Sequence, residues 1–154
     1  MTHIELSLSP LAQPVSAPAQ SPMESGMADP LEQWAAPIAA AEESCLVIDA
    51  EGIIVAASRP FARMFCLSQP SELTGRHVLD AEVLLLIDFT AAGNALGESE
   101  RDQIPPLLAL SSARLARGLM RVRNGEDSRT LDAVATPLRQ GGQVVGSLSF
   151  FAVV

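Results

Sequence analysis

The sequence lacks lysine altogether, so its ten basic residues are all arginine. Residues 1–58 contain no basic residue, although they carry eight of the 18 acidic ones. Residues 59–154 hold the other ten acids and all ten arginines, which makes this part neutral. A nucleic-acid-binding domain concentrates positive charge on one element. The charge distribution therefore argues against that class, and we expect no nucleic-acid partner.

Long apolar runs are missing as well. Even runs such as Val83–Ile87 and Phe150–Val154 have five residues, whereas a membrane-spanning helix needs roughly 20 residues. The N-terminus has neither the basic stretch nor the apolar segment of a secretory signal. We therefore predict a cytoplasmic protein without membrane contact.

Residue patterns typical of disulfides, metal sites and catalytic sites are scarce. The two cysteines, Cys45 and Cys66, are too few for a disulfide framework or a metal set, and we expect two buried free thiols. The sequence has no G-x-S-x-G motif, no phosphate-binding glycine loop and no Cys/His pair with an orienting group. We read the acidic residues between Glu98 and Asp102 as a solvated loop. We expect no enzyme, no catalytic residue and no bound metal.

At 154 residues the chain has the size of one domain. Its first part, residues 1–28, reads as a disordered tail. Proline recurs there every four residues, from Pro10 to Pro22, among Ser, Ala and Gln, without an aromatic residue. Such a segment cannot bury enough apolar surface to offset its ordering entropy.

A short amphipathic helix is predicted within residues 29–43. Asp29 can cap its first turn, and Leu31, Trp34 and Ile38 fall on one helical face. Pro37 predicts a kink or break. The apolar face needs a cover, which is either a second subunit in a homodimer or the sheet of the same chain.

Strand patterns begin at Ser44. An apolar run at residues 45–48, a turn at 49–52 and a second run at 53–57 indicate a hairpin. Ser58 can cap a helix over residues 59–65. Further helices are expected at 70–73 and 105–112, a buried segment at 84–89, an exposed loop at 93–102, and strands at 119–123, 130–138 and 144–154.

This order resembles the PAS fold, and local motifs resemble it too. Cys45–Val55 is similar to the family's opening hairpin with its Asp-x-x-Gly turn, and Ser71–Arg76 to its Glu-Leu-x-Gly-Arg helix end. Residues 135–138 and 142–146 are similar to the last hairpin. The resemblance covers residues 43–154. It implies an α+β fold over residues 44–154: a five-stranded antiparallel sheet with short helices on one face, preceded by the N-terminal helix.

The cofactor chemistries of PAS domains can be compared with these residues. Flavin-binding photoreceptors of the family carry a reactive cysteine where Val78 stands, two residues after Arg76. Haem-binding members that use histidine place it on the helix corresponding to residues 105–112, which contain none. We read His77 as a structural, half-exposed residue, and the absence of tyrosine excludes a Tyr-anchored chromophore. We therefore expect no cofactor and a colourless protein.

PAS domains commonly hold a ligand between helices and sheet. The resemblance implies a small, mostly apolar ligand here, and these side chains are the candidates to line its cavity: Val47, Phe61, Phe65, Val78, Leu107, Leu110, Met120 and Leu148. The alternative is that they simply fill the core, as in many domains of this size.

PAS sensors usually act on an effector, and this chain ends at Val154, after the last predicted strand. We therefore expect a signal sensor that regulates through homodimerisation or binding of a signalling partner. Two alternatives stay open: a constitutive interaction module with a filled core, or the N-terminal sensory part of a longer kinase, cyclase, phosphatase or transcription regulator.

The arginines suggest where the helix could dock. Arg121 and Arg123 share one strand face with Leu119, and Arg129 opens the next strand. Because the segment around Trp34 is acidic, we hypothesise that it docks on this Arg face, within one chain or across a dimer. The alternative is a solvated outer face.

Overall fold

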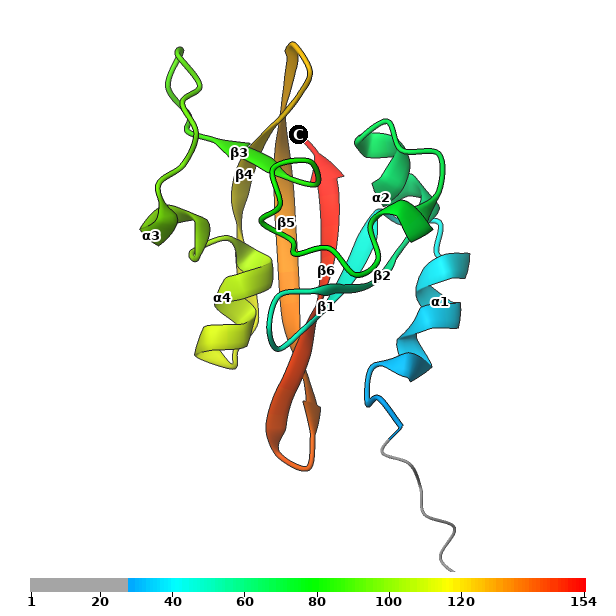
Figure 1. The fold of residues 1–154 in the computed structure, drawn as a ribbon. Helices are drawn as coiled ribbons and strands as arrows, with labels where there is room; N and C mark the ends of the chain where they lie inside the picture. The colour runs from blue at the N-terminus through cyan, green and yellow to red at the C-terminus, as the bar shows by residue number, and fades with distance from the viewer. Residues whose placement is uncertain (1–27) are drawn as a thin grey trace, which may run out of the picture.

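The computed structural model describes residues 28–154, and its centre is one curled antiparallel sheet (Figure 1). The strand order is β2-β1-β6-β5-β4-β3. The strands are β1 Cys45–Asp49, β2 Ile54–Ala57, β3 Leu85–Ile87, β4 Ala116–Asn124, β5 Asp127–Gln140 and β6 Gln143–Val153. The helices are α1 Ala35–Ala40, α2 Arg59–Met64, α3 Glu98–Arg101 and α4 Pro105–Ser112, with 3-10 turns at Glu32–Trp34 and Pro70–Glu72.

The predicted fold class is confirmed, with two corrections. The sheet has six strands rather than five, because the buried segment at 84–89 forms β3 on the edge beside β4. The predicted loop at 93–102 contains α3. The tail predicted for residues 1–28 lies, except for Ala28, outside the described residues.

The opening hairpin forms as its sequence predicts. The Asp49 carboxylate accepts hydrogen bonds from the amides of Glu51 and Ile53, both at 2.9 Å. Gly52 adopts a φ of +84°, which a residue with a side chain rarely adopts. Its missing Cβ also leaves room for the His77 ring, whose Nε2 would lie 2.6 Å from that atom. The turn and the segment at His77 are thus packed together.

The helix before the sheet needs two corrections. The Asp29 carboxylate accepts from the amide of Leu31 at 2.9 Å, but the 3-10 turn that leads into α1 begins at Glu32, with Leu31 as its N-cap residue and no side-chain cap. The break expected at Pro37 is wrong. Pro37 is the third residue of α1, within the first turn, where an amide has no acceptor inside the helix, so proline is tolerated.

The two faces of the sheet carry separate cores. On the inner face, α2 and the segments that follow it cover the larger core, which contains Leu46, Ile48 and Phe61. Residues 29–43, which we call the α1 segment, lie on the outer face. Its residues Leu31 and Ile38 pack there on Cys45, Val47 and Ala56. Since side chains alternate along a strand, β1 contributes to both cores and is buried on both sides.

Candidate functional site

Six of the eight predicted cavity residues lie on the inner face. Phe61, Phe65, Val78 and Met120 are buried in the larger core, and Leu107 and Leu110 of α4 pack partly buried against it. The ring of Phe61 lies 5.1 Å from that of Phe65 and 5.0 Å from that of Phe151, centre to centre. These phenyl groups occupy the space between α2 and the sheet.

Val47 and Leu148 do not belong with these six. They are direct partners across β1 and β6 and lie in the outer core beneath α1. Their assignment to one cavity with Phe61 is therefore wrong. In a strand that is apolar on both faces, the sequence pattern does not tell which face a side chain joins.

A cleft of about 390 Å³ opens beside the inner core. It lies between the tip of the β1–β2 hairpin, the segment His77–Leu79 and α4, and its walls include Gly52, Leu107 and Leu110. Leu107 and Leu110 therefore face both the cleft and the core. This is the place where a small molecule could approach the predicted cavity.

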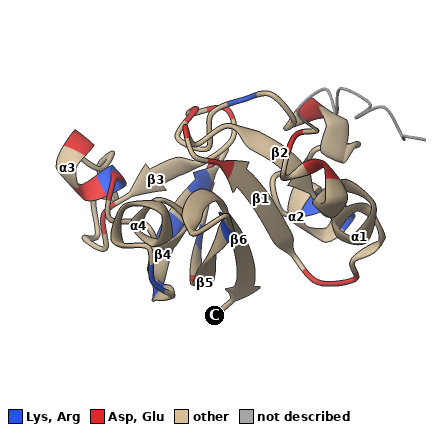
Figure 2. Ribbon diagram, turned by 90° about the horizontal axis from the view of Figure 1, so that it is seen from below, with Lys and Arg blue, Asp and Glu red and all other residues tan. Residues whose placement is uncertain are grey.

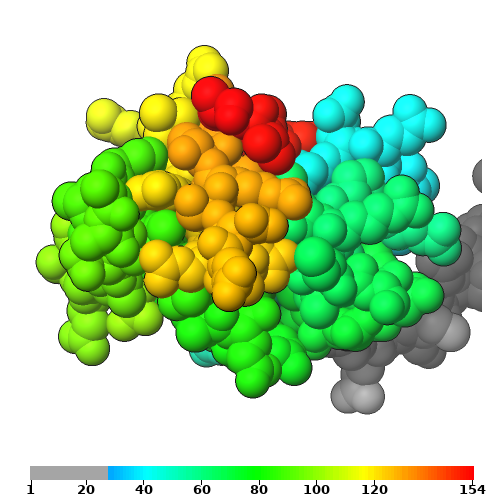
Figure 3. All heavy atoms as spheres, turned by 90° about the horizontal axis from the view of Figure 1, so that it is seen from above, coloured from blue at the N-terminus to red at the C-terminus, as the bar shows by residue number. Residues whose placement is uncertain are grey.

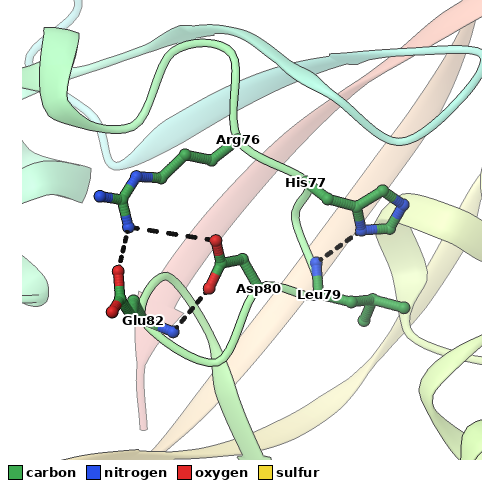
Figure 4. Close-up of polar contacts among 5 residues, drawn as sticks. All are labelled: Arg76, His77, Leu79, Asp80 and Glu82. Carbon is green, nitrogen blue, oxygen red and sulfur yellow. Dashed lines mark hydrogen bonds and ion pairs between the residues drawn. The ribbon is translucent and has the colours of Figure 1, made fainter.

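One wall of the cleft is fixed by polar contacts (Figure 4). The Nδ1 atom of His77 accepts from the amide of Leu79 at 3.0 Å, so in the neutral ring Nε2 carries the hydrogen. Arg76 forms an ion pair with Glu82 at 2.7 Å and lies 4.0 Å from Asp80. His77 points away from this charged group, in line with the structural role predicted for it.

Small residues form the sheet floor under α4. Ala109 of α4 is fully buried against Ala116 and Ala135. The Ser147 hydroxyl donates to the carbonyl of Pro106 at 2.8 Å. The neighbouring Ser149, which is 1% exposed, has a hydroxyl without a hydrogen-bond partner. A buried hydroxyl in this position is costly, and no sequence motif marks it.

The apolar face predicted for residues 29–43 is covered within the chain. Leu31 is 1% and Ile38 4% exposed, and Trp34 is half-buried against the same outer core. Of the two covers that the sequence allowed, the chain's own sheet is the one the structure shows for this apolar face. A homodimer built on these buried side chains is therefore no longer needed to cover them.

The arginines of β4 do not hold the acidic helix. Arg121 donates to the carbonyls of Asp88 and Thr90, at 3.2 and 2.8 Å, and Arg123 donates to the carbonyl of Gly93 at 2.8 Å. The hypothesis that the acidic segment docks on them within one chain is wrong. The helix lies over β1 and β2, whereas β4 is next to the opposite edge.

The loop that these arginines hold is organised by Asp88. Its carboxylate accepts from the amide and hydroxyl of Thr90 and from the amide and side chain of Asn94. These hydrogen bonds lower the pKa of Asp88 below its ordinary value, and the one from the Thr90 side chain has the largest effect. Phe89, which follows Asp88 in the chain, is 60% exposed.

One ion pair was not predicted, and one of the two cysteines differs from the prediction. Arg117 forms a two-bond ion pair with Asp132, at 2.6 and 3.2 Å, which lowers the pKa of Asp132. Cys66 is exposed rather than buried, whereas Cys45 is buried as expected. Burial raises the pKa of the Cys45 thiol.

Residues 28–154 contain no helix that is both long and apolar enough to cross a membrane. In the same part of the chain, no three His, Cys, Asp or Glu side chains are grouped so that they could hold a metal ion.

Solved structures identify the fold. The PAS domain of a Colwellia psychrerythraea protein is 16% identical and superimposes with a TM-score of 0.56, covering 80% of this chain and 96% of its own. The PAS domain of Bordetella pertussis BvgS is 15% identical, with a TM-score of 0.58 and coverages of 82% and 88%. VqmA, in a structure described as bound to DPO, is 16% identical with a TM-score of 0.54, and the match covers 80% of this chain and 57% of that one.

No family model matches the sequence, and no curated sequence matches it. At these identities the structural likeness shows the architecture alone. The chain has the PAS fold.

Proposed function

We propose that this chain is a non-enzymatic sensory domain. In this proposal, a small and mostly apolar ligand enters from the hairpin cleft and lodges between α4 and the inner core. Its presence changes homodimerisation or the binding of a signalling partner. The observation that carries the proposal is the cleft of about 390 Å³ whose walls, Leu107 and Leu110, are also part of the inner core.

Two more observations support it. The hydroxyl of Ser149 is buried on the inner face without a partner, so it offers a hydrogen bond to one polar atom of a ligand. Among proteins of this fold, VqmA is described as bound to DPO.

The element that could move is α4. Its start is tied to the sheet by the Ser147–Pro106 hydrogen bond, and its end by Arg139, which donates to the carbonyl of Ala113 at 2.6 Å. Between them, α4 rests on alanines, which make few contacts compared with larger side chains. A ligand that separates α4 from these alanines would lose little packing there, and the larger contacts to be rearranged are those of Leu107 and Leu110 with the inner core.

Native mass spectrometry of the chain purified from its own host tests the proposal. We expect a bound small molecule that is lost in Leu107→Trp, where the larger ring fills the cleft. Leu119→Trp, an exposed position outside the cleft, is the matched control and should keep the molecule. A wild-type chain of bare polypeptide mass, with no change in melting temperature on adding an extract of host metabolites, would refute a ligand sensor.

The second candidate is a constitutive interaction module with a filled core. The observation in its favour is Phe61, which is 0% exposed and contacts two other phenyl rings. The same experiment separates the two functions, because the module requires no bound molecule and its association should be the same with and without the extract.

A further inference from the structure

A short stretch of backbone around His77 pairs with the edge of β2 and with the turn before it. The amide of Ile54 donates to the carbonyl of Arg76 at 2.8 Å, and the amide of Val78 donates to the carbonyl of Gly52 at 2.9 Å. These two hydrogen bonds lie on either side of His77 in the chain. They fix the backbone there, so the His77 ring moves by rotation of its side chain.

Two contacts hold the His77 ring in place. Its Nδ1 atom accepts from the amide of Leu79 at 3.0 Å, and this bond requires a free lone pair, so that nitrogen carries no proton. The ring also lies over Gly52, where an added Cβ would be 2.6 Å from Nε2 and 3.1 Å from Cε1. A neutral His77 therefore joins the β1–β2 turn to the segment that carries Leu79.

Leu79 connects this ring to the hairpin cleft. Its side chain lines the cleft together with Leu107 and Leu110 of α4, and all three pack, partly buried, against the inner core. The His77 ring lines the same cleft. A change in the hydrogen bond between His77 and the Leu79 amide therefore acts directly on a wall of the cleft.

We propose that protonation of His77 opens the hairpin cleft. A proton from solvent binds the lone pair of Nδ1, and the ring becomes a cation with an N–H bond at each nitrogen. The new N–H and the amide N–H of Leu79 then face each other across 3.0 Å, and the amide loses its acceptor. The ring rotates away from Leu79 and from Gly52, so the turn and the cleft wall are no longer joined and Leu79 separates from α4.

The charged groups around the hairpin cleft favour the protonated ring once it has turned. Glu51 of the β1–β2 turn and Asp102, which follows α3, line the cleft with His77. Asp49, at the start of the turn, is a third acid on this side. Red segments mark the end of β1 and α3 in Figure 2, whereas α4 is tan because residues 105–112 carry no charge. A cationic ring in the cleft therefore meets carboxylates.

The charged residues on the segment of His77 itself are engaged with one another. Arg76 forms its ion pair with Glu82 and lies near Asp80. Figure 4 shows this group on the other side of the backbone from the His77 ring. The guanidinium of Arg76 therefore does not oppose a positive charge on His77 from within the cleft.

Away from the cleft, the segment after α2 is anchored by a separate contact. Seen from above, its green atoms lie against the yellow and orange atoms of the β4–β5 turn (Figure 3). The side-chain amide of Asn124, in this turn, donates to the Sγ atom of Cys66 at 3.2 Å. A rearrangement at His77 therefore opens the molecule at the cleft and leaves this contact in place.

This inference rests on the proposed function only for what enters the cleft, because the opening itself requires no ligand. Amide hydrogen exchange of the full chain, corrected for the intrinsic rate at each pH, is the test. We compare about pH 8 with about pH 5, which lie on either side of the ordinary histidine pKa. The protection of the Leu79 amide should fall about tenfold at the lower pH, because the amide has lost its acceptor.

His77→Asn is the matched variant. The side-chain oxygen of asparagine accepts from the amide two residues further on and does not titrate, so Leu79 should stay protected at both pH values. His77→Phe keeps a ring over Gly52 but has no acceptor, so the Leu79 amide should exchange fast at both. His3→Asn removes the only other histidine and should leave the wild-type response unchanged.

Nile red, a neutral dye that fluoresces in apolar surroundings, reports the opening of the cleft. It should bind the wild type more strongly at the lower pH and bind His77→Asn equally at both. Equal protection of Leu79 at both pH values would overturn the proposal, and so would a pH response that survives in H77N or dye binding that does not follow the exchange. A chain of bare polypeptide mass that shows the pH response refutes the ligand sensor alone, whereas a bound molecule without the pH response refutes this inference alone.

Discussion

Leu31→Ala should detach the α1 segment from the sheet. Leu31 is 1% exposed and lies against Gly146, where an added Cβ would come within 3.0 Å of its Cδ1 atom. Among the described residues, no ion pair or side-chain hydrogen bond joins 29–43 to the sheet. The segment is held by apolar contacts, so truncating Leu31, its most deeply buried side chain, acts on docking directly.

The size of the effect follows from burial. Truncating a fully buried leucine to alanine costs about 2–5 kcal/mol. Since about 1.4 kcal/mol corresponds to a factor of ten in an equilibrium constant, local opening should rise about thirtyfold at the lower limit. The opened state uncovers Cys45, which packs beneath α1.

Thiol alkylation measures this opening. Cys66 is exposed and should react at once in every variant, which makes it an internal standard. Cys45 should react slowly in the wild type and at least about thirtyfold faster in Leu31→Ala. Emission from Trp34, the only tryptophan, should shift to longer wavelength at the same time.

The control is Leu73→Ala. Leu73 is 0% exposed in the inner core, so its truncation lowers global stability without loosening α1. If Cys45 reacts at the wild-type rate in Leu31→Ala, or accelerates equally in Leu73→Ala, then α1 does not protect it by local docking and the reasoning fails.

Three further predictions concern single residues. Burial raises the pKa of the Cys45 thiol, so the unfolded chain loses this proton at lower pH than the folded one. The free energy of unfolding should therefore fall as pH rises above the ordinary thiol pKa. Denaturant titrations should show this fall in the wild type and not in Cys45→Ala, and the same pH dependence in both proteins would contradict the prediction. Asp88→Ala should speed amide hydrogen exchange at 89–94 because the loop loses its acceptor, and unchanged exchange would show that the arginines suffice. Gly146→Ala should cost about 1–3 kcal/mol of stability by overpacking, since its Cβ would meet the carbonyl of Ile48; an unchanged melting temperature would exclude this clash.

Local chemistry explains why much of the fold could be predicted. The Asp49–Gly52 turn has an acceptor carboxylate and a glycine at the positions that need them. Ser58 caps α2 by accepting from the amide of Phe61, at 3.3 Å. Prolines at its start mark α4, whose bounds are those predicted. Each signal is set by residues adjacent in the chain.

The predictions that failed depend on tertiary contacts. β3 is three residues long, and its strand character comes from pairing with Arg121–Arg123 of β4. The face of Val47 could not be assigned, because Cys45–Ile48 is apolar throughout and alternation gives no signal in such a run. Leu148 stands between Ser147 and Ser149, and this alternation suggests that the serines face solvent, but both are buried and pair with the inner-core positions of β1. The location of Ser149 under α4 has no local signature at all.

Arg121 and Arg123 explain why the prediction from charge, that the α1 segment docks on them, was wrong. An arginine side chain is long and its guanidinium carries five N–H donors. Arg121 and Arg123 therefore donate to nearby backbone carbonyls, those of the 88–94 loop. An exposed ion pair contributes only about 0–1 kcal/mol, too little to draw α1 across the sheet from the apolar contacts of Leu31 and Ile38. Apolar burial therefore decides where α1 docks within the chain, and the acids around it stay exposed.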